Sequence, residues 1–386
     1  MLALTVEPET TSKPMNATTH DSTRRAFLQM AAASAASASL SPRVLAQQIA
    51  RTTAPPGLRW GVVGTGSIAR SMAKAIKAAK GAELVAVSSR RMESAEAYAE
   101  QHGAEHAFDS WAQMATAGEV DAIYVATPTS VREEICIAAA RGGKHVLGEK
   151  PLASLASVNR ILAACRENDV AFMDGTHFAH HPRTRELQTR RDEWVGATTL
   201  LDSSCAFNLQ DRSNIRYNPK LEPMGAIGDA GWYNMRAAVE CLPPGIKLES
   251  VQAVLRRDQE TGAAMGGSGE LRFEGGVRST WMCGFDAKPS IMHVHLEGND
   301  GELEMPGFLF QERDNSARLE VKRTGAEPST HRIPSEKPGS ALMFEDMAAA
   351  AANPSLRAGW ANRTRRTQAL LDAVWHVALA AEADGG

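Results

Sequence analysis

The stretch LRWGVVGTGSIA, residues 58–69, joins a short apolar run to a glycine-rich loop and then to the beginning of a helical pattern. In such a loop Gly64 permits a tight turn and Gly66 lets the backbone approach a phosphate group, while the helix that follows offers N–H donors. The pattern alone is weak, and a purely structural glycine turn is the alternative. Its place between a strand and a helix favours a dinucleotide site, whose predicted cofactor-binding residues are Gly64, Thr65, Gly66, Ser67, Ile68 and Ala69.

The chain around this loop alternates β-rich runs with helical stretches. The further runs read ELVAVS, DAIYVAT, KHVLGE and VAFMD, and residues 154–168 between them have the apolar spacing of an amphipathic helix. Alternation of this kind is typical of a parallel sheet with crossover helices. We therefore predict an α/β Rossmann domain with a doubly wound parallel sheet over residues 58–178.

The end of the second run discriminates between the two nicotinamide cofactors. A carboxylate there accepts hydrogen bonds from the ribose of NAD and repels the 2′-phosphate of NADP. This chain has Ser89 followed by Arg90 and Arg91, and a hydroxyl beside guanidinium groups can bind a phosphate. The sequence predicts NADP, with NAD less favoured, and the alternative for the two arginines is a solvated helix start.

Residues 179–386 have a different pattern. From about Trp194 to Arg323 the chain reads as successive β-rich runs with hairpin-like turns, and residues 363–381 carry an apolar helical stripe. We predict a C-terminal α/β domain built on a large, mostly antiparallel open sheet, so that the whole chain is α/β plus α+β. This second domain is expected to serve substrate binding and oligomerisation. An open sheet face of this size usually finds a partner, which favours a homo-oligomer.

The composition narrows the partners. The 386 residues are 43% apolar and 23% charged with a net charge of -3, which indicates a globular protein without the basic footprint of a nucleic-acid or anionic-membrane binder. Small-molecule ligands fit this balance better. The five cysteines lie far apart without metal-ligand spacing, and an odd number cannot all pair within one chain, so we predict buried free thiols.

The N-terminal segment contains STRRAFLQM, residues 22–30. Arg24 and Arg25 precede an Ala/Ser-rich apolar stretch and a small-residue site ending at Ala46, a pattern typical of a twin-arginine export signal. We predict a signal over residues 1–46, an extended arm over residues 47–57, and a periplasmic protein without a membrane anchor. Met1 and Met15 stay open as starts, and an alanine-rich tail with a chance arginine pair is the alternative.

Four motifs occur in one order along the chain. They are GTGSIA, VATPTS at residues 125–130, GEKP at residues 148–151 and GAIGDAGWY at residues 225–233. From about Leu58 to the C-terminus the sequence resembles the Gfo/Idh/MocA oxidoreductase family, which includes glucose-fructose oxidoreductase and inositol dehydrogenase. The resemblance is nearest to the exported, NADP-retaining glucose-fructose oxidoreductase subgroup.

This resemblance implies roles on the cofactor side. Lys150 matches the lysine of the EKP motif, which sits by the nicotinamide and the reacting hydroxyl, and Glu149 precedes it in the same motif. Thr127 and Pro128 match the turn that lines the cofactor. Arg132 is a departure, since many members have histidine there, and the packing around the cofactor is expected to differ accordingly.

Asp229 and Tyr233 match the family's Asp-x-x-x-His pair, with tyrosine where most members carry histidine. In the glucose-fructose oxidoreductase subgroup this tyrosine is the proposed acid/base. The spacing agrees, because residues four apart on a helix share one face and can reach one hydroxyl. We expect the cationic Lys150 and the oxidised nicotinamide ring to stabilise the phenolate and so to lower the tyrosine pKa. A buried, structural Tyr233 is the alternative.

The stretch DGTHFAHHPRT, residues 174–184, gathers further polar side chains. A metal site formed by His177, His180 and His181 is conceivable, but the proline that follows them disfavours the helical geometry that it needs. We predict no metal. We predict substrate contacts at His177, at Arg183 and at Arg216, which lies on a loop leading to Asp229.

The predicted activity is that of an NADP-dependent sugar oxidoreductase. A protein exported in folded form can carry its cofactor inside, so the cofactor must stay bound and be reoxidised in place. We expect ping-pong hydride transfer in which an aldose is oxidised to a lactone and a second sugar carbonyl is reduced. The alternatives are an NAD(P)-dependent glycoside hydrolase of the same fold, an ordinary dissociable sugar or cyclitol dehydrogenase, and a non-catalytic sensor.

Overall fold

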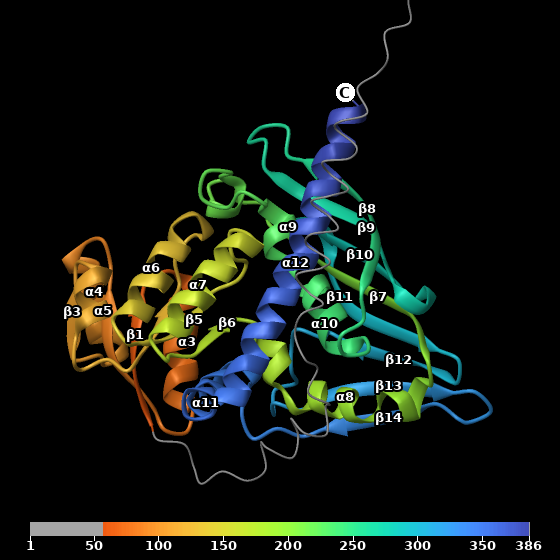
Figure 1. Cartoon of the computed structure of the whole chain (residues 1–386), viewed down its shortest axis with the longest axis horizontal. Coiled ribbons are helices and arrows are strands. Elements are labelled where there is room, and N and C mark those ends of the chain that lie inside the picture. Colours follow the sequence, from red (N-terminus) through yellow and green to blue (C-terminus); the bar gives the residue numbers. More distant parts are fainter. Residues whose placement is uncertain (1–56, 386) are drawn as a thin grey trace, which may run out of the picture. The chain divides into compact units, whose positions relative to one another are not determined.

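The computed structural model describes residues 57–385 (Figure 1). The predicted export signal and, apart from Gly57, the predicted arm lie outside the described residues. The described chain contains two sheets, one of six strands and one of eight.

The six-stranded sheet has the order β3-β2-β1-β4-β5-β6, and all of its pairs are parallel. The order reverses between β1 and β4, and in open parallel sheets ligands bind at the carboxyl edge beside such a reversal. The predicted doubly wound sheet is therefore confirmed. Its strands are β1 (Leu58–Val63), β2 (Ala82–Ser88), β3 (His106–Phe108), β4 (Ala122–Val125), β5 (His145–Gly148) and β6 (Phe172–Asp174).

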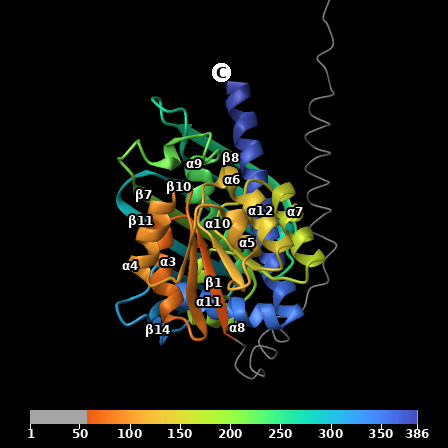
Figure 2. The same ribbon diagram turned by 90° about the vertical axis from the view of Figure 1, so that its left-hand side faces the viewer.

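Helices cover both faces of this sheet (Figure 2). On one side lie α3 (Ser67–Ala78) and α4 (Met92–His102), and on the other α5 (Trp111–Thr116), α6 (Thr129–Arg141) and α7 (Leu155–Glu167). Helix α3 buries Met72 and Ile76 in the same cluster as Trp60 of β1. Because α3 is fixed in this way, its N-terminus stays at the carboxyl edge of β1.

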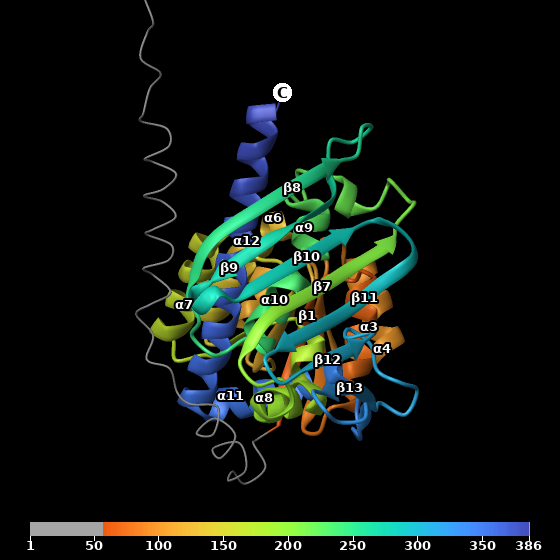
Figure 3. The ribbon, with the colours of Figure 1, turned by 90° about the vertical axis from the view of Figure 1, so that its right-hand side faces the viewer.

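The eight-stranded sheet has the order β14-β13-β12-β11-β7-β10-β9-β8, and its broad side faces the viewer in Figure 3. Only the β10–β7 pair is parallel, so the predicted mostly antiparallel sheet is confirmed. Its strands are β7 (Thr198–Asn208), β8 (Leu248–Arg257), β9 (Ala264–Phe273), β10 (Arg278–Gly284), β11 (Asp286–Gly298), β12 (Gly301–Pro306), β13 (Ala317–Arg323) and β14 (Ser329–Ile333).

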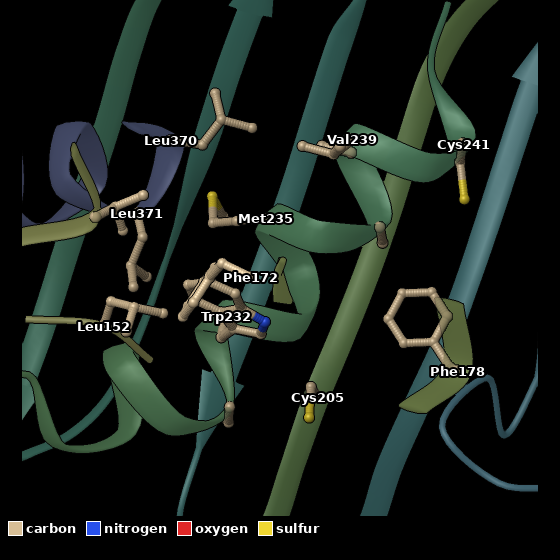
Figure 4. Close-up of a cluster of buried hydrophobic side chains, with 14 of the residues drawn as sticks. Leu152, Phe172, Phe178, Cys205, Trp232, Met235, Val239, Cys241, Leu370 and Leu371 are labelled. Atoms are coloured by element: carbon tan, nitrogen blue, oxygen red, sulfur yellow. The ribbon is translucent and has the colours of Figure 1, made fainter. Parts of the chain in front are cut away.

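The remaining helices lie between β6 and β7, between strands of the second sheet, or after β14. They are η1 (His177–His180), α8 (Pro182–Val195), η2 (Ile215–Tyr217), α9 (Gly225–Asp229), α10 (Gly231–Cys241), η3 (Glu274–Gly276), α11 (Gly339–Ala352) and α12 (Pro354–Gly385). Helix α10 is buried on nearly every side. Its Trp232 and Met235 belong to one apolar cluster with Phe172 of β6 and Leu371 of α12 (Figure 4). Packing of this kind fixes α10, and the residues at its N-terminus, against the first sheet.

Helix α12 begins earlier than its apolar stripe predicts. The side chain of Asn353 accepts hydrogen bonds from the backbone N–H groups of Ser355 (2.9 Å) and Leu356 (3.3 Å), with Pro354 at the first helical position. Asparagine caps and first-turn prolines both favour a helix start. Further along, Gln368 of α12 accepts from the N–H of Leu152 at 3.2 Å, which ties the helix to the loop after β5.

All five cysteines are buried and free, as predicted. Burial raises the pKa of each thiol, with Cys205 at about 12. Within residues 57–385, moreover, no helix is both long enough and apolar enough to cross a membrane.

A histidine on β11 predicts a local pH dependence of stability. Nδ1 of His295 lies 2.6 Å from Glu304 and Nε2 lies 3.0 Å from Glu297, with Glu302 at 4.0 Å. Burial opposes protonation of His295, but the carboxylates outweigh it and raise its pKa. A histidine whose pKa is higher in the folded than in the unfolded protein stabilises the fold when it is protonated. This contribution is fully present below the unfolded pKa of about 6.5 and disappears as the pH rises through the folded pKa.

We therefore expect His295→Gln to lower the melting temperature below about pH 6.5 and to have little effect at high pH. The loss should be at most about 1 kcal/mol, because solvent screens the partner carboxylates. Thermal unfolding of both proteins from pH 5 to pH 9 measures it. A difference that grows with pH would contradict the assignment.

Candidate active site

Lys150, Asp229 and Tyr233 meet although they come from different parts of the chain. Lys150 follows β5 at the carboxyl edge of the first sheet, and its Nζ donates to Oδ1 of Asp229 at 2.7 Å. The same Nζ lies 4.4 Å from the ring centroid of Tyr233. The structure thus brings together the three residues that we predicted as catalytic.

A helix break explains how one lysine reaches both. Asp229 ends α9 and Tyr233 lies in α10, and Ala230 between them keeps a helical backbone conformation while the hydrogen-bond pattern is interrupted. In a continuous helix the Tyr233 N–H would donate to the carbonyl of Asp229. It donates instead to Ala230 O at 3.1 Å, and Lys150 Nζ donates to the Asp229 carbonyl at 2.8 Å. The break therefore gives Lys150 a second acceptor on the same residue.

The close approach of these elements depends on a glycine. A Cβ on Gly228 would lie 3.1 Å from Cγ of Pro151 and 2.9 Å from Cβ of Met224. A larger residue would push α9 away from the loop that carries Lys150. Gly228 therefore allows α9 to approach this loop closely.

Arg216 completes the ion pairing. Its Nε donates to Oδ2 of Asp229 at 2.7 Å, and a second guanidinium nitrogen lies 3.3 Å from Oδ1. Asp229 is therefore held between two cations, with its side chain 13% exposed. Arg216, predicted as a substrate contact, lies within reach of the same place and fixes the carboxylate there.

The charges in this cluster stabilise one another. Burial by itself raises the pKa of Asp229, but Lys150 and Arg216 outweigh it and hold this pKa well below its usual range. Burial likewise lowers the pKa of Lys150, and Asp229 more than compensates, so its pKa is raised overall. The lysine is a fixed cation and the aspartate a fixed anion at neutral pH.

Tyr233 stands in contrast to these two residues. Burial raises its pKa to about 12, and the opposing effect of Lys150 is smaller. Lys150 by itself therefore does not bring the pKa of Tyr233 below its ordinary value, because removal of the ring from water outweighs one nearby cation. Within the described residues the Tyr233 hydroxyl makes no hydrogen bond, so it is free for a substrate.

The predicted phosphate turn has the features that a dinucleotide needs. Gly64 has φ of +102° and packs against the carbonyl of Ala126, while a Cβ on Gly66 would meet no atom within 4 Å. No side chain caps the N-terminus of α3, so its first N–H groups remain available. The turn continues into α3 through Thr65, Ser67, Ile68 and Ala69. Of these four residues only Ala69 is fully buried.

The other predicted cofactor residues lie at the ends of neighbouring strands. Ser89, half-buried, follows β2, with Arg90 and Arg91 exposed beside it. Thr127 and Pro128 lie between β4 and α6, and the Thr127 hydroxyl is buried without a hydrogen-bond partner. An orphaned buried hydroxyl at this edge fits a bound polar ligand.

Glu149 has partners within the protein. The Tyr124 hydroxyl donates to its Oε1 at 2.5 Å, and the Lys150 N–H donates to Oε2 at 3.1 Å. With only 6% exposure, Glu149 supports the loop that carries Lys150. Tyr124 could not be identified from the sequence, because it lies in a strand and has the pattern of a core residue.

The histidines of residues 177–181 do not converge. His180 pairs with Asp346 at 2.8 Å, and Nε2 of His181 lies 2.8 Å from the Asn315 carbonyl. His177 is half-buried with its Nε2 unpartnered, and burial lowers its pKa, with Glu149 and Lys150 as charged neighbours. Arg183 is 2% exposed and donates to the Phe308 carbonyl. The structure thus puts His177 near Lys150, while Arg183 of α8 binds the backbone carbonyl of Phe308.

Comparisons with known proteins agree with this geometry. Residues 58–176 match a family described as an oxidoreductase family with an NAD-binding Rossmann fold. The chain is 31% identical over 278 residues to dTDP-3,4-didehydro-2,6-dideoxy-alpha-D-glucose 3-reductase of Actinomadura kijaniata, covering 71% of this chain and 77% of that protein.

Two solved structures share the architecture. One is a 3-ketoreductase from Actinomadura kijaniata in complex with NADP and TDP-benzene, with a TM-score of 0.76, 26% identity and coverage of 83% of this chain and 97% of the other. The second is an aldose-aldose oxidoreductase from Caulobacter crescentus, with a TM-score of 0.75, 20% identity and coverage of 84% and 98%. At that identity the second likeness concerns the fold alone.

The parallel sheet has an open phosphate turn, and the relatives are oxidoreductases. Together these findings identify the protein as an NAD(P)-dependent oxidoreductase. The chain belongs to the Gfo/Idh/MocA oxidoreductase family.

Proposed function

We propose that this protein is an NADP-dependent sugar oxidoreductase that retains its cofactor, oxidising an aldose to a lactone and then reducing a second sugar carbonyl. The observation that carries the proposal is the free Tyr233 hydroxyl beside the Lys150 ammonium at the carboxyl edge of a dinucleotide-binding sheet. The NADP complex of the structural relative with 26% identity supports the cofactor. The exported glucose-fructose oxidoreductase-like subgroup and a periplasmic location remain parts of this proposal.

Proton transfer is the task of Tyr233. With a pKa of about 12 it is protonated at neutral pH, so it is ready to donate a proton to a sugar carbonyl during reduction. In the oxidative direction Tyr233 must act as the phenolate, which Lys150 stabilises, and it becomes a phenol again when it accepts the proton of the sugar hydroxyl. Bound NADP supplies the hydride chemistry, and the protein supplies placement.

Asp229 and Arg216 orient the sugar substrate. Two cations hold the carboxylate in one position, and hydrogen bonding to both consumes much of its acceptor capacity. A sugar hydroxyl at Tyr233 would find the Lys150 ammonium and the Asp229 carboxylate beside it. Such fixed groups position a substrate without moving during the reaction.

Retention places a requirement on affinity. If loss of the cofactor takes hours, its off-rate is about 10⁻⁴ s⁻¹, and with an on-rate of about 10⁶ M⁻¹s⁻¹ the dissociation constant is about 0.1 nM. A nearly enclosed dinucleotide can reach that affinity. With the cofactor trapped, the first product must leave before the second sugar enters, which gives ping-pong kinetics.

The test is to denature the purified protein, release its nucleotide and determine its identity and oxidation state. We expect NADP in about one equivalent per chain, converted to the reduced form by an aldose alone and reoxidised by a second sugar. Protein without bound nucleotide, active only with added NADP, would instead support an ordinary dissociable dehydrogenase. The reductase and dehydrogenase names of the relatives favour that as the second candidate.

Cofactor choice gives a separate prediction. Arg90→Ala should weaken NADP binding about 10–100-fold and leave NAD binding nearly unchanged, because a hydrogen bond to a charged group is worth about 1.5–3 kcal/mol. Competition binding to nucleotide-free protein measures the ratio. Arg141→Ala, an exposed arginine at the end of α6, is the control. An equal loss for both nucleotides would show that Arg90 does not contact the 2′-phosphate.

We also propose that the protein forms a homo-oligomer through the outward face of the eight-stranded sheet. The exposed Val254 of β8 and Ile291 of β11 lie on strands of this sheet and support the proposal. Light scattering of the purified protein measures the oligomer size.

A further inference from the structure

A segment of the second half of the chain docks beside the predicted cofactor turn. Residues 209–224 join β7 to α9, and Figure 1 shows them as the green segment next to α9. Oε1 of Glu222 accepts from the Thr129 N–H at 3.0 Å, and Oε2 accepts from the Thr129 hydroxyl at 2.6 Å. The carbonyl of Leu221 accepts from the N–H of Ser130 at 3.1 Å. We call residues 209–224 the strap.

The strap caps a helix that has no cap of its own. Pro128 precedes α6 and offers no side-chain hydrogen bond, so the first N–H groups of the helix need other acceptors. Glu222, 93 residues further along, supplies one, and its negative charge suits the positive end of the helix. The N-terminus of α3 lacks any such side-chain cap, so α6 is closed by the protein while α3 stays open for a ligand.

Arg132 links this contact to the catalytic loop. Its guanidinium donates to the carbonyls of Thr127 and Pro151, and to the Thr129 hydroxyl at 3.1 Å. Arg132 is 4% exposed. Arg132 stands where many family members have histidine. It therefore connects the predicted cofactor turn, the loop after Lys150, and Thr129, which binds Glu222.

The strap has a second attachment, at the catalytic cluster. Arg216, within it, holds Asp229, and Asp229 holds Lys150. The nicotinamide end of the cofactor is expected between Thr127 and Lys150, as the family resemblance implies. The strap is thus attached both to the residue after the predicted cofactor turn and to the cluster that holds Lys150.

We propose that the contact of Glu222 with Thr129 is a clasp that must open before the cofactor leaves, and that it sets the dissociation rate of the retained nucleotide. This inference rests on the proposed function. Glu222 and Thr129 act here as positioning residues, since they hold the strap across the site and do not take part in the chemistry.

Glu222→Gln keeps the shape of the side chain and removes its charge, so we expect the off-rate of bound NADPH to rise about 10–100-fold. The loss of NADPH fluorescence after addition of excess NADP measures it. The rate of the first half-reaction, with nucleotide already bound, should change less than about twofold. Glu134→Gln, an exposed glutamate on α6 itself, is the matched control and should leave the off-rate unchanged.

Thr129→Val provides a second test if the glutamine variant folds poorly. It removes only the hydroxyl contact, so it should raise the off-rate by a smaller factor, and Thr129→Ser should restore it. Equal off-rates in wild type, Glu222→Gln and Thr129→Val would overturn the clasp and leave cofactor retention intact. Release from the wild type within seconds would overturn retention, while the ratio between variant and wild type would still decide the clasp.

Discussion

Tyr233→Phe is expected to lower the rate of sugar oxidation about 10²–10⁴-fold, the usual contribution of a positioned acid or base. The hydroxyl that it removes makes no hydrogen bond within the described residues, so the fold should be unaffected. Single-turnover reduction of the bound nucleotide by an aldose measures the effect without interference from product release. Bound nucleotide should be retained at the wild-type level.

The pH dependence sharpens this prediction. Because the pKa of Tyr233 is about 12, the oxidative rate of the wild type should climb with pH over the accessible range, while the reductive rate stays nearly flat. The rise of the oxidative rate with pH should be absent in Tyr233→Phe. Tyr217→Phe, whose hydroxyl binds the Leu209 carbonyl at 2.7 Å, is the control and should keep the rate within about twofold. Full activity in Tyr233→Phe would exclude the tyrosine as acid/base.

Arg236→Met is expected to destabilise the protein by about 3–5 kcal/mol, the cost of removing one partner of a buried ion pair. Arg236 of α10 and Asp174 of β6 form this pair with both side chains fully buried. Asp174 also accepts from the Thr364 hydroxyl at 2.6 Å. Denaturant unfolding of both proteins measures the difference, and the pair matters for function because it fixes the helix that carries Tyr233 against the first sheet.

The deficit should shrink as the pH falls. Burial opposes the charge of Asp174, but Arg236 and hydroxyl donors hold its pKa below the usual range, and without Arg236 protonation would relieve the buried charge. Arg185→Met removes an arginine whose side chain is 45% exposed and which pairs with Asp346, so it should cost less than about 1 kcal/mol. A similar cost for both variants would show that burial of the Arg236 pair has no special weight.

Much of the fold was predictable because its signals are local. The glycines of residues 64–66 lie between an apolar run and an amphipathic helix, and the structure has the predicted turn there. Strand β3 was not predicted, because three residues are too few to show a strand pattern. The start of α12 was not predicted either, because its Asn353 cap lies outside the apolar stripe.

The site was predictable only in part. Lys150, Asp229 and Tyr233 stood out through motifs, and the structure brings them together. The partnership of Arg216 with Asp229 and that of Glu222 with Thr129 connect residues on separate elements, so no spacing in the sequence could reveal them.

The sequence by itself determined the order of strands and helices, the phosphate turn and the residue types at the catalytic positions. These depend on side-chain size, apolar spacing and backbone freedom within short stretches. Only the tertiary structure decided the break at Ala230, the raised pKa of Tyr233 and the two attachments of the strap. The physical reason is that burial, charge pairing and hydrogen bonding between distant segments depend on distances that exist only once the two sheets have packed.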